Sequence, residues 1–195
     1  MCDHKIIDNF YSEAELSLIW EELDFLCYPE KMEFSPGGDL EYDTGLNKFI
    51  KRNSGIFLDE LYQTHRNCSN ILRVNRKIYK DNFKIGKEFI KYLPQENKTC
   101  YLRDYTLINY YENSDYYLEH HDDGILTILY WIYREPKRFE GGEFYLQDEK
   151  IELKNNRLII FPSNIKHSVT EVRMDEEHTD KKLGRFCISQ FIDLK

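Results

Sequence analysis

Two histidines and two aspartates stand side by side at residues 120–123, between two stretches rich in β-branched and aromatic residues. Imidazole nitrogens and carboxylate oxygens are common metal ligands, although such a cluster on a surface loop can serve solubility alone. Alternate side chains of a β-strand share one face, so a His-x-Asp pair points both groups the same way. Two pairings remain open from the residues: His120 with Asp122, or His121 with Asp123.

A tight metal site needs a third ligand from elsewhere in the chain. His167 follows an apolar stretch and a Pro-Ser turn, at the start of another expected strand. The other histidines lie in polar or unpatterned surroundings: His4, His65 and His178. Two histidines and one carboxylate on one face of a metal leave coordination positions open, the geometry of non-haem Fe(II) oxygenases. Together these features predict a metal site.

An arginine near the end of the sequence, Arg185, should share a strand face with Cys187 and Ser189. A guanidinium inside a barrel costs free energy unless a carboxylate pairs with it. A dicarboxylate co-substrate would provide that partner through a bidentate contact. The alternative is an arginine that faces solvent near the start of a strand. Cys187 has no base beside it in the sequence and is expected to pack in the core.

The segments that carry these residues are typical of a β-domain. From Tyr101 onward the chain consists of short β-branched and aromatic stretches separated by turn signals, the pattern of an antiparallel barrel or sandwich. Before it, Ile6-Ile7 predicts a short strand, and Ser12 with Glu15 predicts a helix start with a capping box. The apolar residues that follow recur at helical spacing: Leu16, Ile19, Trp20, Leu23 and Leu26. The apolar positions between Ser69 and Leu93 also fit helices.

Composition limits the function further. With 41% hydrophobic and 15% aromatic residues the 195-residue chain is not a disordered protein. A net charge of −8 disfavours a general nucleic-acid binder, although residues 73–91 hold seven Lys or Arg against two acids. Five cysteines without a C-x-x-C pair indicate reduced thiols, and neither a signal peptide nor a membrane span is recognisable, so we expect a cytoplasmic, soluble protein. The sequence gives no indication of the oligomeric state.

Four segments carry a family resemblance: "YENSDYYLEHHD", "FEGGEFYL", "RLIIFPSNIKH" and "GRFCIS". They resemble the prolyl 4-hydroxylase-like branch of the Fe(II)/2-oxoglutarate-dependent dioxygenases, and the opening strand and helix are similar too. The resemblance covers residues 5–28 and 101–195 and leaves out 30–100. The family's spacing, a tyrosine, six residues to a second tyrosine and three to the histidine, runs through Tyr111, Tyr117 and His120. It therefore selects His120 with Asp122.

The resemblance implies roles residue by residue. The implied iron ligands are His120, Asp122 and His167, and the implied co-substrate contacts are Arg185, Ser189, Tyr117 and Tyr111. Gly141-Gly142 corresponds to a hairpin of the family and is read as structural. Some relatives place a tyrosine where this sequence has Trp131, with Tyr130 facing the other way. Because an indole cannot accept a hydrogen bond as a phenol does, the role of Trp131 stays open, as a wall of the pocket or a substrate contact.

The expected fold is α+β, a double-stranded β-helix (jelly-roll) core at residues 101–195 with N-terminal supporting helices within residues 1–100, in one globule. The implied cofactors are Fe(II) and 2-oxoglutarate, with ascorbate as a further candidate. The implied reaction is hydroxylation of a peptidyl, prolyl substrate with succinate and CO₂ as co-products, and residues 30–100 are expected to carry the substrate-facing loops, one of them at 35–45. Two alternatives remain: a nucleic-acid demethylase of the same superfamily, and a cupin-like metal-binding protein without turnover.

Overall fold

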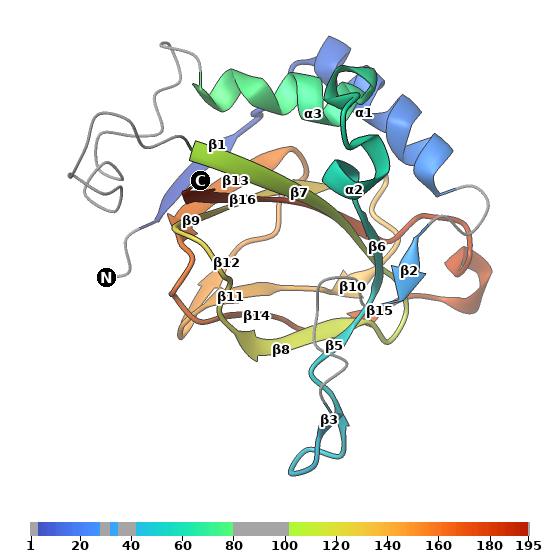
Figure 1. Ribbon diagram of the computed structural model, residues 1–195. Helices are drawn as coiled ribbons and strands as arrows, with labels where there is room; N and C mark the ends of the chain where they lie inside the picture. Colours follow the sequence, from blue (N-terminus) through green and yellow to red (C-terminus); the bar gives the residue numbers. More distant parts are fainter. Residues whose placement is uncertain (1–3, 28–31, 35–41, 80–101, 195) are drawn as a thin grey trace.

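Two antiparallel β-sheets face each other, with helices on the outer side of one of them (Figure 1). The computed structural model describes residues 4–27, 32–34, 42–79 and 102–194. The larger sheet has seven strands in the order β1 (Lys5–Asp8), β13 (Arg157–Pro162), β9 (Leu126–Ile132), β16 (Arg185–Leu194), β7 (Leu102–Tyr111), β6 (Ser54–Phe57) and β2 (Glu33–Phe34).

The smaller sheet carries most of the candidate metal ligands. Its five strands run in the order β12 (Glu149–Ile151), β11 (Phe144–Leu146), β14 (His167–Val169), β8 (Tyr116–His120) and β5 (Lys51–Arg52). Two further two-stranded pairs are β10 (Glu140–Gly141) with β15 (Val172–Arg173), and β3 (Tyr42–Asp43) with β4 (Lys48–Phe49). Strands far apart in sequence thus meet in both sheets.

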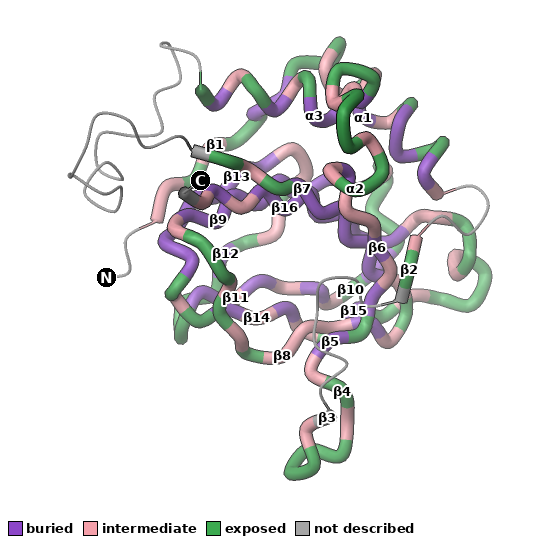
Figure 2. Tube along the Cα trace, in the orientation of Figure 1, coloured by how far each residue is buried: buried purple, intermediate pink, exposed green. Residues whose placement is uncertain are grey.

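Strand alternation divides the core into two layers. All seven residues of β9 are buried, because both faces of the large sheet are covered. Ile128 and Tyr130 face the helices, whereas Leu129 and Trp131 face the space between the sheets, where Phe144 of the small sheet meets them. Figure 2 shows the buried residues concentrated along β9, β13 and β16.

The helices cover the outer face of the large sheet. They are α1 (Glu13–Leu26), α2 (Leu58–Tyr62) and α3 (Asn70–Asn75), with 3₁₀ turns η1 (Arg66–Cys68), η2 (Arg76–Tyr79) and η4 (Glu176–His178) elsewhere. The predicted capping box of α1 is confirmed: Ser12 Oγ accepts from Glu15 N–H at 3.3 Å, and Glu15 Oε2 accepts from Ser12 N–H at 2.8 Å. The apolar stripe of α1 packs inward through Ile19, Leu23 and Leu26.

The predicted mainly β architecture with N-terminal helices is confirmed at this level. Each stretch expected to form a strand after residue 101 contains one, and Ile6-Ile7 lies in β1. The N-terminal half also supplies β5 and β6 to the two sheets, which the sequence had not predicted. The expected helices of residues 80–93, the boundary at residue 100 and residues 35–41 of the 35–45 loop lie outside the described residues. Among the described helices, none is long and apolar enough to cross a membrane.

Candidate metal centre

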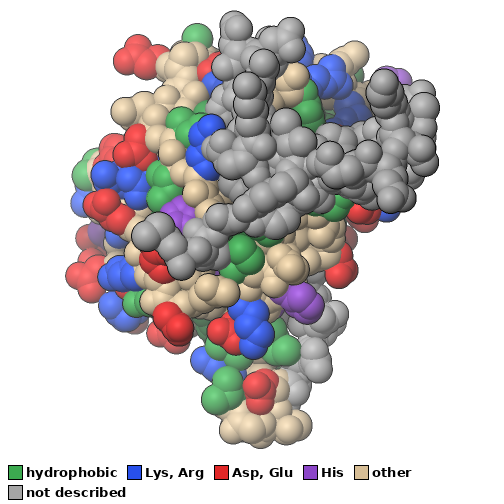
Figure 3. All heavy atoms as spheres, turned by 90° about the vertical axis from the view of Figure 1, so that its left-hand side faces the viewer, with side chains coloured by type: hydrophobic (Ala, Val, Ile, Leu, Met, Phe, Trp, Pro, Cys, Tyr) green, Lys and Arg blue, Asp and Glu red, His purple; other side chains and the backbone are tan. Residues whose placement is uncertain are grey.

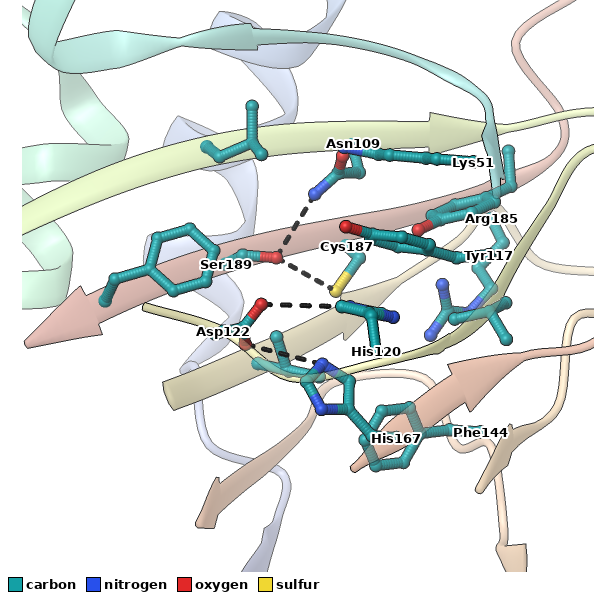
Figure 4. A pocket seen from close by; sticks show the side chains of 15 residues that line it. Lys51, Asn109, Tyr117, His120, Asp122, Phe144, His167, Arg185, Cys187 and Ser189 are labelled. Carbon is teal, nitrogen blue, oxygen red and sulfur yellow. Dashed lines mark hydrogen bonds and ion pairs between the residues drawn. The ribbon is translucent and has the colours of Figure 1, made fainter. Parts of the chain in front are cut away.

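Three side chains that could bind a metal converge between the two sheets. His120 ends β8, His167 begins β14, and these residues face each other across the strand pair. Asp122 lies two residues beyond β8, in a turn held by its N–H, which donates to the Ser163 carbonyl at 3.0 Å. One ligand atom from each residue lies within 4.8 Å of the other two. Figure 4 shows the three side chains pointing toward one another.

The second pair, His121 and Asp123, is exposed and is not part of this cluster. The register that the family spacing selects is therefore the one in which the side chains gather, with Asp122 placed by the turn rather than by the strand. That the cluster binds a metal stays a prediction.

The two imidazoles are oriented by backbone carbonyls. His120 Nδ1 lies 2.8 Å from the Leu118 carbonyl, and His167 Nδ1 lies 2.9 Å from the Ile165 carbonyl. Because a carbonyl oxygen only accepts, each Nδ1 carries a hydrogen and each Nε2 faces the carboxylate of Asp122. The distances are 3.7 Å from His120 Nε2 to Oδ1 and 3.4 Å from His167 Nε2 to Oδ2. Lone pairs that converge in this way fit a bound cation.

The protonation states also suit a cation. Burial, together with the neighbouring His167, lowers the pKa of His120 to about 3, so His120 is neutral at pH 7. Burial raises the pKa of Asp122, but its contacts with the two histidines and Thr127 outweigh burial and bring the pKa below the ordinary value. A neutral imidazole and an ionised carboxylate are the forms that bind metals.

The buried hydroxyl groups of Thr127 and Ser163 form a chain of contacts that ends on the carboxylate of Asp122. Thr127 Oγ1 donates to Asp122 Oδ2 at 2.7 Å, and Ser163 Oγ lies 3.0 Å from the same hydroxyl. Sequence reasoning missed both. A signal existed for Thr127, because it is the only serine or threonine within the apolar run of β9.

Tyr117 stands between His120 and a buried lysine. Its ring stacks on His120 with centroids 3.4 Å apart and planes 11° from parallel. Lys51 Nζ lies 5.0 Å from the centroid of the Tyr117 ring, on the other side from His120 in Figure 4. Lys51 is only 1% exposed, and burial lowers its pKa to about 8. Sequence reasoning did not identify Lys51.

Arg185 lies in the same pocket with its charge buried. The side chain is 0% exposed, and its carbon Cζ is 5.0 Å from the Tyr111 ring centroid and 5.7 Å from that of Trp131. Among the described residues, Nε, Nη1 and Nη2 of Arg185 have no hydrogen-bond partner. The alternative that this arginine faces solvent is therefore wrong. A guanidinium in this position calls for an anion that the described residues do not provide.

The remaining predicted residues lie around this pocket. Ser189 Oγ accepts from Asn109 Nδ2 at 3.2 Å, and Asn109 in turn accepts from Asn53 at 2.8 Å. Tyr130 faces the helical side, as predicted, and donates to Gln190 at 2.7 Å. The side chains that line the pocket include Lys51, Asn109, Tyr111, Tyr117, His120, Asp122, Phe144, His167, Arg185, Cys187 and Ser189. That Tyr111, Tyr117 and Ser189 contact a co-substrate stays a prediction.

Comparisons with known proteins agree with this chemistry. Residues 105–193 match the family model described as the 2OG-Fe(II) oxygenase superfamily. Similar solved structures include a Trichoplax adhaerens prolyl hydroxylase in complex with a hypoxia-inducible-factor peptide fragment (15% identity, TM-score 0.61, covering 97% of this chain and 83% of that one). Others are a Pseudomonas putida prolyl-4-hydroxylase (12%, 0.57, covering 98% and 92%) and a viral collagen prolyl hydroxylase from Paramecium bursaria Chlorella virus-1 (14%, 0.55, covering 97% and 94%). A search of curated proteins found no match. At these identities the structures establish a shared fold.

Proposed function

We propose that this chain, a 2OG-Fe(II) oxygenase by the match of its residues 105–193, hydroxylates a prolyl residue in a peptide or protein. The proposed cofactors are Fe(II) held by His120, Asp122 and His167, and 2-oxoglutarate held at its far carboxylate by Arg185. The two facing sheets would be the double-stranded β-helix of that superfamily. Ascorbate remains an untested expectation.

One observation carries the proposal: a cluster suited to a cation shares a single pocket with a buried guanidinium that has no hydrogen-bond partner among the described residues. A metal-binding protein without turnover would explain the cluster but would leave the cost of burying Arg185 unexplained. A 2-oxo dicarboxylate explains both, since one end can chelate a metal while the other pairs with a guanidinium.

When bound, Fe(II) and 2-oxoglutarate supply the oxidative chemistry, which converts 2-oxoglutarate and O₂ to succinate and CO₂ and places one oxygen atom on the substrate. The protein orients the cofactors. His120 and His167 present Nε2 because their Nδ1 atoms are engaged by backbone carbonyls. Three protein ligands leave coordination positions open, and Phe144 and Leu129 contribute apolar surface to the pocket wall.

A hollow beside the metal centre supports a peptide substrate. It shares Tyr117, Asp122 and Phe191 with the buried pocket and reaches the surface past Tyr105 and Phe57. Aromatic walls suit a pyrrolidine ring, because its aliphatic C–H groups pack against the faces of aromatic rings. The Trichoplax prolyl hydroxylase is in complex with a peptide fragment, which makes a prolyl peptide the first substrate to test here.

The nucleic-acid alternative draws little support from the described residues. In the basic stretch, Arg73 donates to Asn70, Arg76 donates to Asn67 and Lys77 donates to Glu15. These residues lie on or next to α3, which covers the face of the large sheet opposite the pocket. Figure 3 shows the side of the molecule that lies on the left in Figure 1. Over the described part of that side, acidic and basic side chains are interspersed without a continuous basic patch. Residues 80–91 of the stretch lie outside the described part.

The test is anaerobic binding of Fe(II) and 2-oxoglutarate, followed by succinate release after air is admitted, with and without a proline-containing peptide library. We expect His120→Ala to abolish metal binding and Arg185→Ala to abolish 2-oxoglutarate binding while metal binding persists. The matched control is His121→Ala, which alters an exposed neighbour. Mass spectrometry of the peptides should detect the gain of one oxygen atom on proline.

Other outcomes separate the alternatives. Metal binding without 2-oxoglutarate binding would indicate the non-catalytic protein. Succinate formation that responds to methylated oligonucleotides but to no peptide would replace the prolyl substrate with nucleic acid. Equal loss of metal in His120→Ala and His121→Ala would reject the proposed ligands.

A further inference from the structure

Trp131 places a second unused hydrogen-bond donor beside Arg185. The indole is 0% exposed, and its Nε1 has no hydrogen-bond partner among the described residues. Trp131 pairs with Cys187 across the β9–β16 ladder, and Arg185 lies two residues before Cys187 on the same face. Trp131 and Arg185 are therefore diagonal neighbours, which matches the 5.7 Å between the guanidinium carbon and the indole centroid.

We propose that the indole N–H of Trp131 donates a hydrogen bond to the anionic group that Arg185 binds. On the proposed function, on which this inference rests, that group is the far carboxylate of 2-oxoglutarate. Trp131 is then a co-substrate-binding residue rather than a substrate contact, since its burial keeps it from the hollow where substrate enters.

Donor and acceptor chemistry favours a shared carboxylate. An indole N–H and a guanidinium have hydrogen-bond donors and no acceptors, so neither can satisfy the other. Four buried nitrogen atoms without a partner in the described part of the chain thus come from two neighbouring side chains. An ionised carboxylate accepts several hydrogen bonds at its two oxygens and is the group that satisfies such a set. A tryptophan at position 131, where some relatives have a tyrosine, is consequently compatible with binding a carboxylate, because a carboxylate needs hydrogen-bond donors.

The indole is also held in place. Phe144 of the small sheet packs against it with ring centroids 5.4 Å apart, and both side chains are fully buried. A donor fixed by packing loses little freedom when its acceptor arrives. It follows that the site should select an ionised carboxylate over the corresponding primary amide, whose N–H₂ group would face donors.

The experiment observes the indole directly. The chain has two tryptophans, Trp20 and Trp131, so a ¹⁵N–¹H spectrum contains two indole signals, which Trp20→Phe assigns. The protein is loaded with Zn(II), a diamagnetic ion that accepts histidine and carboxylate ligands, and titrated with 2-oxoglutarate. We expect the Trp131 indole proton to move downfield as the site saturates, while the signal of Trp20, on α1 outside the large sheet, stays in place.

A binding measurement complements the spectrum. Trp131→Phe keeps an aromatic ring against Phe144 but removes the N–H, and we expect roughly tenfold weaker binding of 2-oxoglutarate with Zn(II) affinity unchanged. The amide analogue, 5-amino-2,5-dioxopentanoate, should bind weakly to the wild type. An unmoved Trp131 signal at saturation overturns the inference, and this result is read from the wild-type protein once Trp20→Phe has assigned the two signals.

Failure of the inference can be told from failure of the proposed function. Saturable 2-oxoglutarate binding that depends on Arg185 but leaves the Trp131 signal unmoved overturns the role of Trp131 alone. Zn(II)-loaded wild type that does not bind 2-oxoglutarate at all overturns both.

Discussion

At the scale of single residues, the carboxylate of Asp122 owes its position to a buried hydroxyl. Thr127 donates to it at 2.7 Å, and replacing the hydroxyl by a methyl group in Thr127→Val keeps the shape of the side chain. We expect the Fe(II) affinity to fall roughly tenfold or more, because groups that orient metal ligands have effects of that size. Anaerobic titration with Fe(II) or Zn(II) measures it.

Thr127→Ser is the matched control for that variant. It retains the hydroxyl and should bind metal almost as the wild type does. If Thr127→Val and Thr127→Ser bind equally well, the hydrogen bond does not position Asp122.

Lys51 gives a prediction about stability and pH. Its pKa is lowered from 10.5 to about 8, mainly by burial, so its charge destabilises the folded state. The penalty is complete below pH 8, where both the folded and the unfolded chain carry the proton, and it disappears as the pH rises toward 10.5. Lys51→Met should therefore raise the free energy of unfolding at pH 7 by up to roughly 3 kcal/mol.

The measurement is urea unfolding of the metal-free protein at pH 7 and near pH 10, because a bound cation would add its own repulsion. The increase in the free energy of unfolding caused by Lys51→Met should be smaller at the higher pH. An equal increase at both pH values would mean that packing, and not charge, accounts for it.

Residue-scale prediction from the sequence is possible where chemistry coincides with spacing. His120, Asp122, His167 and Arg185 could be singled out because their types are specific and their segments carry recognisable motifs. Lys51 could not, since a lysine in a two-residue strand carries no pattern that separates it from a solvent-facing lysine. Its burial arises only when β5 pairs with β8.

At the scale of elements, the bend at Gly141-Gly142 helps to fix the position of Arg185. The hairpin expected here is wrong, because β10 pairs with β15 whereas β11 pairs with β12 and β14. Gly142 has a φ of +63°, and a Cβ there would lie 2.9 Å from Val172 Cγ2 and 3.2 Å from Arg185 Cδ. We expect Gly142→Ala to destabilise the fold by about 1–3 kcal/mol and to weaken 2-oxoglutarate binding. Metal affinity should change little, because the metal ligands lie on β8, β14 and the turn after β8. Thermal unfolding and separate titrations with Zn(II) and 2-oxoglutarate measure these effects.

Gly141→Ala separates backbone strain from the contact with Arg185. A Cβ at Gly141 would lie 2.1 Å from the Glu171 carbonyl oxygen, and Arg185 is not among its three nearest neighbours, so Gly141→Ala should destabilise the bend more severely. If Gly142→Ala weakens metal and 2-oxoglutarate binding equally, the bend supports the pocket as a whole and not Arg185 in particular.

The same scale shows which elements a sequence can predict. β7, β9, β13 and β16 are six to ten residues long and rich in β-branched and aromatic residues, so they were predictable from local composition. β5 and β6 are two and four residues long and are stabilised by pairing with β8 and β7, whose partner residues lie 50 to 66 positions away in the sequence. Local periodicity cannot report such a contact, which explains why the N-terminal half was predicted as helical support without these strands.

At the scale of the whole molecule, the two sheets differ in how they are stabilised. The large sheet has a helical layer on one face and the inter-sheet core on the other. The small sheet is made of strands of two to five residues, and two of them, β8 and β14, carry His120 and His167. A metal that joins β8, β14 and the turn at Asp122 should therefore stabilise the small sheet selectively, because it binds the folded arrangement of these segments and not their open forms.

Removing the metal should loosen the small sheet while the large sheet stays folded. With Zn(II) at a hundred times its dissociation constant, amide exchange in β8 and β14 should slow by up to about a hundredfold relative to the chelator-treated protein. Exchange in β9 and β13 should change much less. Hydrogen exchange followed by mass spectrometry resolves these segments, and His120→Ala, which lacks a ligand, should show no dependence on Zn(II). Equal slowing of exchange in both sheets would mean that the metal stabilises the fold as one cooperative unit. The prediction that the metal stabilises the small sheet selectively would then be wrong.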